Sequence, residues 1–307
     1  MRVMIAYDGS PCAEAAVEDL SRAGLPTEVE VLLVSVTETW LPPPSGLELV
    51  TPGVVTSIHE RTEAMKVQVA RIEGRLRGRF PAWSIETMQG AGSPATVLLQ
   101  KAEEWKPDLI VVGSHGAGPV QRFLIGSVSQ RVATHAPCSV RIARGRVEDG
   151  VVEGPARLVV GIDGSIDSDM AVYVVAHRSW PVGTEVRLVT SIGPMVSTQS
   201  LVTYPEEKSV VEEWQGKAAR RLREAGLEVS TVLSFEDPKR ALVHEAESWG
   251  ADAIFVGSHG RGAVARFLLG SVSAAVTARA HCSVEIVRSV STAIWPDGEE
   301  GATLVGE

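Results

Sequence analysis

The stretch Val111-Val112-Gly113-Ser114-His115-Gly116 recurs 144 residues later as Phe255-Val256-Gly257-Ser258-His259-Gly260. When the 17 positions from Gly113 to Ser129 are set against the copy that begins at Gly257, 13 of them are identical. Agreement over so many consecutive positions is far above chance. A repeat with so long a period indicates a duplicated domain rather than a short solenoid unit.

The starts of the two copies match as well, at a slightly larger offset. Ile5-Ala6-Tyr7-Asp8-Gly9-Ser10 corresponds to Val160-Gly161-Ile162-Asp163-Gly164-Ser165, 155 rather than 144 residues later, so the first copy holds 11 more residues in its middle. Segment 41–52, which includes three consecutive prolines, has no counterpart and is either a lid over the first copy's ligand site or a surface loop. We expect two domains, 1–146 and 156–290, with a linker at 147–155 and a tail at 291–307.

Each copy alternates strand and helix patterns. The apolar, β-branched run Val29–Val36 is typical of a strand that is buried on both faces. In the first copy the expected strands are Arg2–Tyr7, Val29–Val36, Trp83–Gln89, Asp108–Val112 and Ser139–Ala143, and the expected helices are Pro11–Ala23, Thr56–Arg79, Pro94–Trp105 and Ser127–His135. In the second copy they are Leu158–Ile162, Val186–Ser191, Glu228–Ser234, Ala253–Val256 and Ser283–Val287, with helices Asp167–Arg178, Glu206–Ala225, Pro238–Trp249 and Ser271–Ala280. This alternation predicts an α/β fold: two tandem, Rossmann-like domains, each an open five-stranded parallel sheet with helices on both faces.

The composition excludes several classes of protein. With 29 Lys and Arg against 38 Asp and Glu, the formal charge of −9 disfavours a nucleic-acid partner, and an aromatic content of 5% leaves little for base stacking. No apolar run is long enough to cross a membrane, and the N-terminus lacks a signal-peptide pattern, so we expect a cytoplasmic protein without membrane association. Three cysteines and seven histidines show no metal-ligand spacing.

The repeated motif is predicted to lie where a ligand would bind. Ligands of open parallel sheets bind beyond the carboxyl ends of the strands, where the strand order reverses. Asp8 and Asp163 end the first strand of each copy, and the repeated glycine motif follows the fourth strand and opens the next helix. Glycines let backbone N–H groups approach an anion, and a helix N-terminus offers unpaired N–H groups with a positive dipole end. This combination predicts a nucleotide site with its phosphates at the helix start.

The candidate binding residues occupy equivalent places in both copies. They are Asp8, Val36, Gly113, Gly116, Arg122, Gly126, Ser127 and Val128 in the first copy, and Asp163, Ile192, Gly257, Gly260, Arg266, Gly270, Ser271 and Val272 in the second. Three alternatives stay open: the glycines form tight turns without a ligand, the two aspartates cap the following helices, and the two arginines are solvated. His115 and His259 are interpreted as exposed loop residues, since no acidic residue is near them in sequence.

The spacing Gly-x2-Gly-x9-Gly-Ser followed by Val resembles the nucleotide-binding motif of the universal stress protein family, in its ATP-binding branch. Both copies match in full, and the Asp-Gly-Ser turn and the run Ala136-Pro137-Cys138-Ser139-Val140 are also similar to that family. The resemblance covers nearly the whole chain and identifies a tandem type. It implies a sheet ordered 3-2-1-4-5, ATP in the cleft, and pairing of the last strands, 139–143 and 283–287, as a pseudo-dimer.

The resemblance implies a stress-response protein that binds ATP with Mg²⁺, up to two per chain, as a sensor or regulatory ligand. The P-loop lysine is absent and no base for water activation is evident, so at most slow hydrolysis is expected and no catalytic residue is assigned. A protein partner is expected but not identified, and the resemblance also implies a homodimer through exposed sheet edges. The alternatives are a slow ATPase or nucleotidyl-transfer enzyme of the related adenine-binding α/β superfamily, and an ATP-independent scaffold or chaperone.

Overall fold

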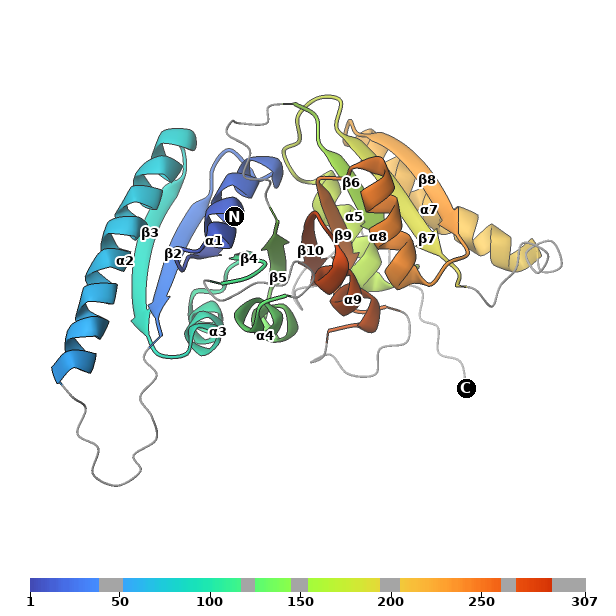
Figure 1. Ribbon diagram of the computed structural model, residues 1–307. Helices are drawn as coiled ribbons and strands as arrows, with labels where there is room; N and C mark the ends of the chain where they lie inside the picture. Colours follow the sequence, from blue (N-terminus) through green and yellow to red (C-terminus); the bar gives the residue numbers. More distant parts are fainter. Residues whose placement is uncertain (39–51, 117–124, 145–153, 194–204, 261–268, 289–307) are drawn as a thin grey trace, which may run out of the picture.

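A computed structural model describes residues 1–38, 52–116, 125–144, 154–193, 205–260 and 269–288, with the backbone alone at 52–59 and 205–208 (Figure 1). The sequence hypotheses on Arg122, Arg266, segment 41–51 and the tail 291–307 lie outside these ranges. The rest of the candidate site lies inside them.

The predicted order of strands and helices is confirmed. In the first half the strands are β1 Arg2–Ala6, β2 Glu30–Thr37, β3 Ser84–Ala91, β4 Leu109–Gly113 and β5 Ser139–Ala143, and the helices are α1 Pro11–Asp19, α2 Pro52–Arg79, α3 Pro94–Trp105 and α4 Ser127–His135. In the second half they are β6 Arg157–Gly161, β7 Glu185–Ser191, β8 Glu228–Ser234, β9 Ala253–Gly257 and β10 Ser283–Val287, with α5 Ile166–Ala176, α7 Pro205–Glu224, α8 Pro238–Trp249 and α9 Ser271–Arg279.

Two helix boundaries differ from the prediction by more than two residues. Helix α1 ends at Asp19, because Leu20–Arg22 tightens into a 3₁₀ turn (η1) and Gly24, with φ +62°, takes a left-handed conformation that does not continue a helix. Helix α2 begins at Pro52 rather than at Thr56. Ser10 is the N-cap of α1, since its Oγ accepts the N–H of Ala13 at 3.1 Å.

All ten strands form one sheet, in the order β3-β2-β1-β4-β5-β10-β9-β6-β7-β8. Within each half the strands are parallel and follow the order 3-2-1-4-5 that the family resemblance implied. The halves join through β5 and β10, which pair antiparallel with Arg141 opposite Glu285, at the centre of Figure 1. The implied pairing of the two last strands is therefore confirmed.

The helices cover the two faces of the sheet differently. On one face, α3, α4, α8 and α9 contribute to a single apolar core that runs across both halves and includes Leu98, Val132, Leu242 and Val276. On the other face each half has its own core, built on α1 and α2 in the first half and on α5 and α7 in the second. The halves therefore share part of their hydrophobic interior.

A buried ionic network lies where the halves meet. The side chain of Arg141 is 0% exposed; its Nε donates to Asp19 Oδ2 at 2.6 Å and its Nη1 to Glu285 Oε2 at 3.3 Å. Glu285, also fully buried, accepts a second hydrogen bond from Arg178 Nη1 at 2.8 Å, and Ser283 Oγ donates to Asp19 at 2.8 Å. Each buried charge has a partner of opposite sign, as burial requires.

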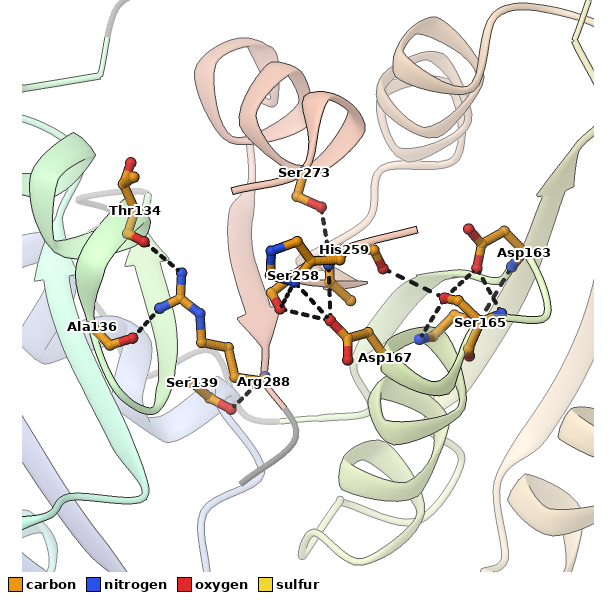
Figure 2. Close-up of polar contacts among 12 residues, drawn as sticks. Thr134, Ala136, Ser139, Asp163, Ser165, Asp167, Ser258, His259, Ser273 and Arg288 are labelled. Carbon is orange, nitrogen blue, oxygen red and sulfur yellow. Dashed lines mark hydrogen bonds and ion pairs between the residues drawn. The ribbon is translucent and has the colours of Figure 1, made fainter. Parts of the chain in front are cut away.

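The arginine that follows the last strand of each half reaches into the other half. Arg144, after β5, donates to Thr277 O at 2.5 Å near the end of α9. Arg288, after β10, donates to Thr134 O at 3.0 Å and to Ala136 O at the end of α4 (Figure 2). A cation at a helix C-terminus satisfies unpaired carbonyls and complements the dipole. Each half thus caps one helix of the other.

Within the described ranges, no helix is long and apolar enough to cross a membrane, and no cluster of three His, Cys, Asp or Glu side chains could hold a metal ion. Cys138 and Cys282 are buried, and burial raises the pKa of both thiols to about 12. They are therefore packed as small apolar residues.

Replacing Arg141 by Met should destabilise the protein strongly, because Asp19 and Glu285 would keep buried charges without their common partner. We expect the free energy of unfolding to fall by about 3–5 kcal/mol, measured by chemical denaturation. Lys66→Met is the control: Lys66 pairs with Glu63 where both side chains are about half exposed, so its loss should cost under about 1 kcal/mol. Equal denaturation midpoints for the two variants would contradict this account of the network.

Candidate functional site

Two clefts lie at the carboxyl ends of the parallel strands, where the strand order reverses between β1 and β4 and between β6 and β9. The first has a volume of about 790 Å³ and the second of about 480 Å³. Both volumes lie in the range of small-molecule sites. The topology therefore forms a ligand-sized cleft in each half, in equivalent places.

Most of the predicted binding residues line these clefts. The first cleft is lined by Asp8, Val36, Gly113, Gly116, Gly126, Ser127 and Val128, and the second by Asp163, Gly257, Gly260, Gly270, Ser271 and Val272. Ile192 is not among the lining residues: it follows β7, its N–H donates to Ser234 O at 3.1 Å, and Ser191 lines the cleft instead.

The helices α4 and α9 each begin at a cleft without a side-chain cap. Their N-cap residues are Gly126 and Gly270, and neither has a side-chain cap hydrogen bond among the described residues. The N–H of each glycine donates back to the loop before it, Gly126 to Ser114 O and Gly270 to Ser258 O, both at 2.8 Å. The unpaired donors of an α-helix are those of its first turn, and here that turn lines the cleft. Such a terminus is suited to an anion.

At the motif glycines the backbone of neighbouring segments lies so close that a Cβ atom would collide with it. A Cβ on Gly113 would lie 2.8 Å from the backbone carbonyl of Cys12, and one on Gly257 would lie 2.7 Å from the carbonyl carbon of Asp167. A Cβ on Gly126 would lie 3.2 Å from His115 Cα. The alternative that these glycines only allow tight turns is therefore supported by packing alone, without a ligand. A binding role is compatible with it, because the same close packing shapes the cleft.

Asp8 and Asp163 hold the turns that enter α1 and α5. Oδ1 of each accepts the N–H of the residue two positions later, Ser10 or Ser165, at 3.0 Å, while these serines provide the helix caps. A Cβ on Gly116 would lie 2.9 Å from Asp8 Oδ2. Each carboxylate therefore fixes its turn and also lies against the glycine loop that closes the cleft.

The interpretation of His115 and His259 as exposed loop residues is wrong. Nε2 of both imidazoles is buried and has no hydrogen-bond partner among the described residues, while Nδ1 lies 3.1 Å from Ser114 Oγ or 2.9 Å from Ser258 Oγ. The fold also supplies an acidic neighbour that lies 92 residues earlier in the chain, since Asp167 Oδ2 lies 3.2 Å from His259 Nδ1 (Figure 2). The buried Nε2 atoms of both imidazoles therefore face the protein interior rather than open solvent.

Sequence reasoning missed the part that α2 plays in the first cleft. Arg61, Met65 and Gln68 line this cleft at helical spacing, so one side of α2 faces it. That spacing marks one face of a helix but does not tell a cleft wall from a core. Among the described residues, none of those that line the second cleft comes from α7.

The chain belongs to the universal stress protein family, whose family model matches residues 1–144 and again 156–288. It is 29% identical over 299 residues to universal stress protein Rv2005c of Mycobacterium tuberculosis, covering 93% of this chain and 96% of that protein. It is 28% identical over 304 residues to universal stress protein Rv2623 of the same organism, covering 94% and 97%. The crystal structure of a universal stress protein from Archaeoglobus fulgidus has the same fold, with a TM-score of 0.62 and 23% identity over 94% of this chain and 96% of that one.

Replacing Gly113 by Ala should destabilise the protein, because the added methyl group would press on the backbone of α1. We expect the free energy of unfolding to fall by about 1–3 kcal/mol. The matched control is Gly74→Ala in α2, where a Cβ meets nothing within 4 Å and should raise stability by about 0.5–1 kcal/mol. Thermal unfolding distinguishes the two variants, because their melting temperatures should shift in opposite directions. A rise in melting temperature for both would show that the backbone near Gly113 accommodates the added methyl group without loss of stability.

Proposed function

We propose that each half of the protein binds ATP in its cleft as a regulatory ligand. The observation that carries this proposal is the pair of uncapped helix N-termini, at Ser127 and Ser271, that line equivalent clefts together with Asp8 and Asp163. Unpaired N–H groups attract phosphate, and a carboxylate accepts hydrogen bonds from ribose hydroxyl or base amino groups.

The remaining walls of the clefts suit a purine nucleoside. The buried apolar residues that line the first cleft include Val34, Leu98 and Val112, and those that line the second include Val189, Leu242 and Val256. An apolar wall with a few polar groups at one end is the usual design of a small-molecule site. The nucleoside would occupy the apolar part and the phosphates the helix start.

A binding role is favoured over rapid hydrolysis. Among the described residues that line the clefts there is no lysine, and Arg61 lines the first cleft alone; the two histidines hold their Nε2 atoms away from solvent. Efficient phosphoryl transfer requires a positioned cation, metal ligands and a group that orients the attacking water. Mg²⁺ that arrives with ATP would be coordinated chiefly by phosphate oxygens and water.

ATP bound in the clefts can change how the protein binds a partner without being hydrolysed. A ligand that binds only the folded state stabilises it by about 2.7 kcal/mol at a concentration 100 times its Kd. If a conformer that contacts another protein binds ATP better, ATP shifts the population toward that conformer.

Nucleotide stoichiometry tests the proposal directly. The purified protein is denatured, released nucleotide is identified by chromatography, and the emptied protein is titrated with Mg-ATP. We expect uptake of about two ATP per chain. No released nucleotide and no uptake would overturn the proposal and favour a scaffold.

Replacing Ser127 by Glu separates binding from stability. A carboxylate in the first turn of α4 favours the helix dipole, so the melting temperature should stay equal or rise, but it occupies the place proposed for phosphate. Calorimetric titration with Mg-ATP should then detect the second site alone, and Ser271→Glu should leave the first alone. Two intact sites in either variant would show that the phosphates bind elsewhere.

A further inference from the structure

One side chain of the first cleft carries a buried acceptor that the folded chain does not use. Gln68 of α2 lines this cleft, and its Oε1 is buried without a hydrogen-bond partner among the described residues. Gln215 of α7 shows the contrast, since its Nε2 donates to Thr190 Oγ1 and to Val232 O, both at 3.2 Å. A buried polar atom without a partner costs stability. A role in binding a ligand would account for this cost.

Gln68 packs on the turn that follows the first strand. A Cβ on Gly9 would collide with Gln68 Oε1 and would lie 3.6 Å from Met65 Cε. Gly9 has φ +75°, a conformation that favours glycine, and it directly follows Asp8, which also lines the cleft. The carboxamide of Gln68 therefore lies beside the carboxylate that is proposed to bind the nucleoside.

The second half has a different side chain at the equivalent place. Gly164 corresponds to Gly9, and a Cβ on it would lie 2.5 Å from the ring of Trp214 in α7. An indole offers one donor and no acceptor, whereas a carboxamide offers both. Trp214 is also absent from the described residues that line the second cleft. The carboxamide is thus a feature of the first cleft.

A carboxamide is complementary to the edge of adenine. Its oxygen accepts from the exocyclic amino group while its NH₂ group donates to a ring nitrogen, the bidentate pair by which glutamine reads adenine in nucleic acids. The last torsion of a glutamine side chain is broad, and turning Oε1 of Gln68 toward the cleft breaks no hydrogen bond, because Oε1 has none. The carboxylate of Asp8 offers acceptors alone, so it cannot donate to a ring nitrogen.

We propose that Gln68 recognises the adenine base in the first cleft, with Oε1 accepting from the exocyclic amino group and Nε2 donating to a ring nitrogen. This inference rests on the proposed function and adds to it the residue that selects the base. Bound adenine gives the unused acceptor its partner. A purine without the amino group leaves that acceptor unpaired, so the first cleft discriminates against it.

The test removes the side chain and the amino group in turn. Mg-ATP and the magnesium complex of purine riboside triphosphate, which differs from ATP only in lacking the amino group, are titrated by calorimetry into Ser271→Glu, which reports the first cleft. Mg-ATP should bind on the order of tenfold more tightly. Adding Gln68→Met, which is similar in length but cannot form these hydrogen bonds, should remove this preference. Added to Ser127→Glu, which reports the second cleft, it should change neither affinity.

The ligand-free chain gives an independent readout. Because Gln68 Oε1 has no partner to lose, Gln68→Met should leave the melting temperature equal or raise it. Val67→Met is the control on the same helix: Val67 is 71% exposed, so the change should alter neither the melting temperature nor the preference for Mg-ATP. A clear fall in the melting temperature of Gln68→Met alone would show that the carboxamide stabilises the fold and would remove the reason for giving it a ligand.

Equal binding of the two nucleotides by the first cleft, or a preference that survives Gln68→Met, would overturn the inference. If Gln68→Met does not fold, as judged by circular dichroism, Gln68→Glu takes its place. This variant keeps acceptors for the amino group, so loss of the preference in it would overturn the inference as well. No binding of Mg-ATP to either cleft of the wild-type chain would overturn the proposed function itself, whereas equal binding of both nucleotides overturns only the role of Gln68.

Discussion

The rest of the structure depends on the antiparallel pairing of β5 with β10 and on the charges buried at its centre. It turns two five-stranded sheets into one sheet of ten strands and places Arg141 against Glu285, with Asp19 and Arg178 as their second partners. A buried ion pair adds little stability compared with an apolar pair, but a like-charged pair there would be strongly unfavourable. If two first halves met through this edge, Arg141 would face Arg141. The charges therefore favour pairing of unlike halves.

This junction also positions the clefts. It brings α4 and α9 onto the shared apolar core, and the arginines at the ends of β5 and β10 hold the C-termini of these helices. The N-termini of the same helices line the clefts. Each candidate phosphate site is thus one end of a helix whose other end is fixed by the opposite half.

Much of this arrangement could be predicted from the sequence, because local signals encode it. The repeat, the alternating strands and helices, and the convergence of Asp8 with the motif at Gly113–Val128 follow from periodicity and from the geometry of parallel sheets. Family resemblance supplied the strand order and the pairing of the last strands. The contacts that were missed join residues far apart in the chain, such as Asp167 with His259 and Arg288 with Thr134. Local pattern does not reveal them, and so the burial of the histidines and the role of α2 in the first cleft were not foreseen.

The crossing arginines have a practical consequence for taking the protein apart. A fragment that ends before Arg288 would leave the carbonyls at the end of α4 without their cation, and a fragment that starts after Arg144 would do the same to α9. Each isolated half would also expose its side of the shared core to water. Ligand affinities measured on single halves would therefore describe altered helices rather than those of the intact chain.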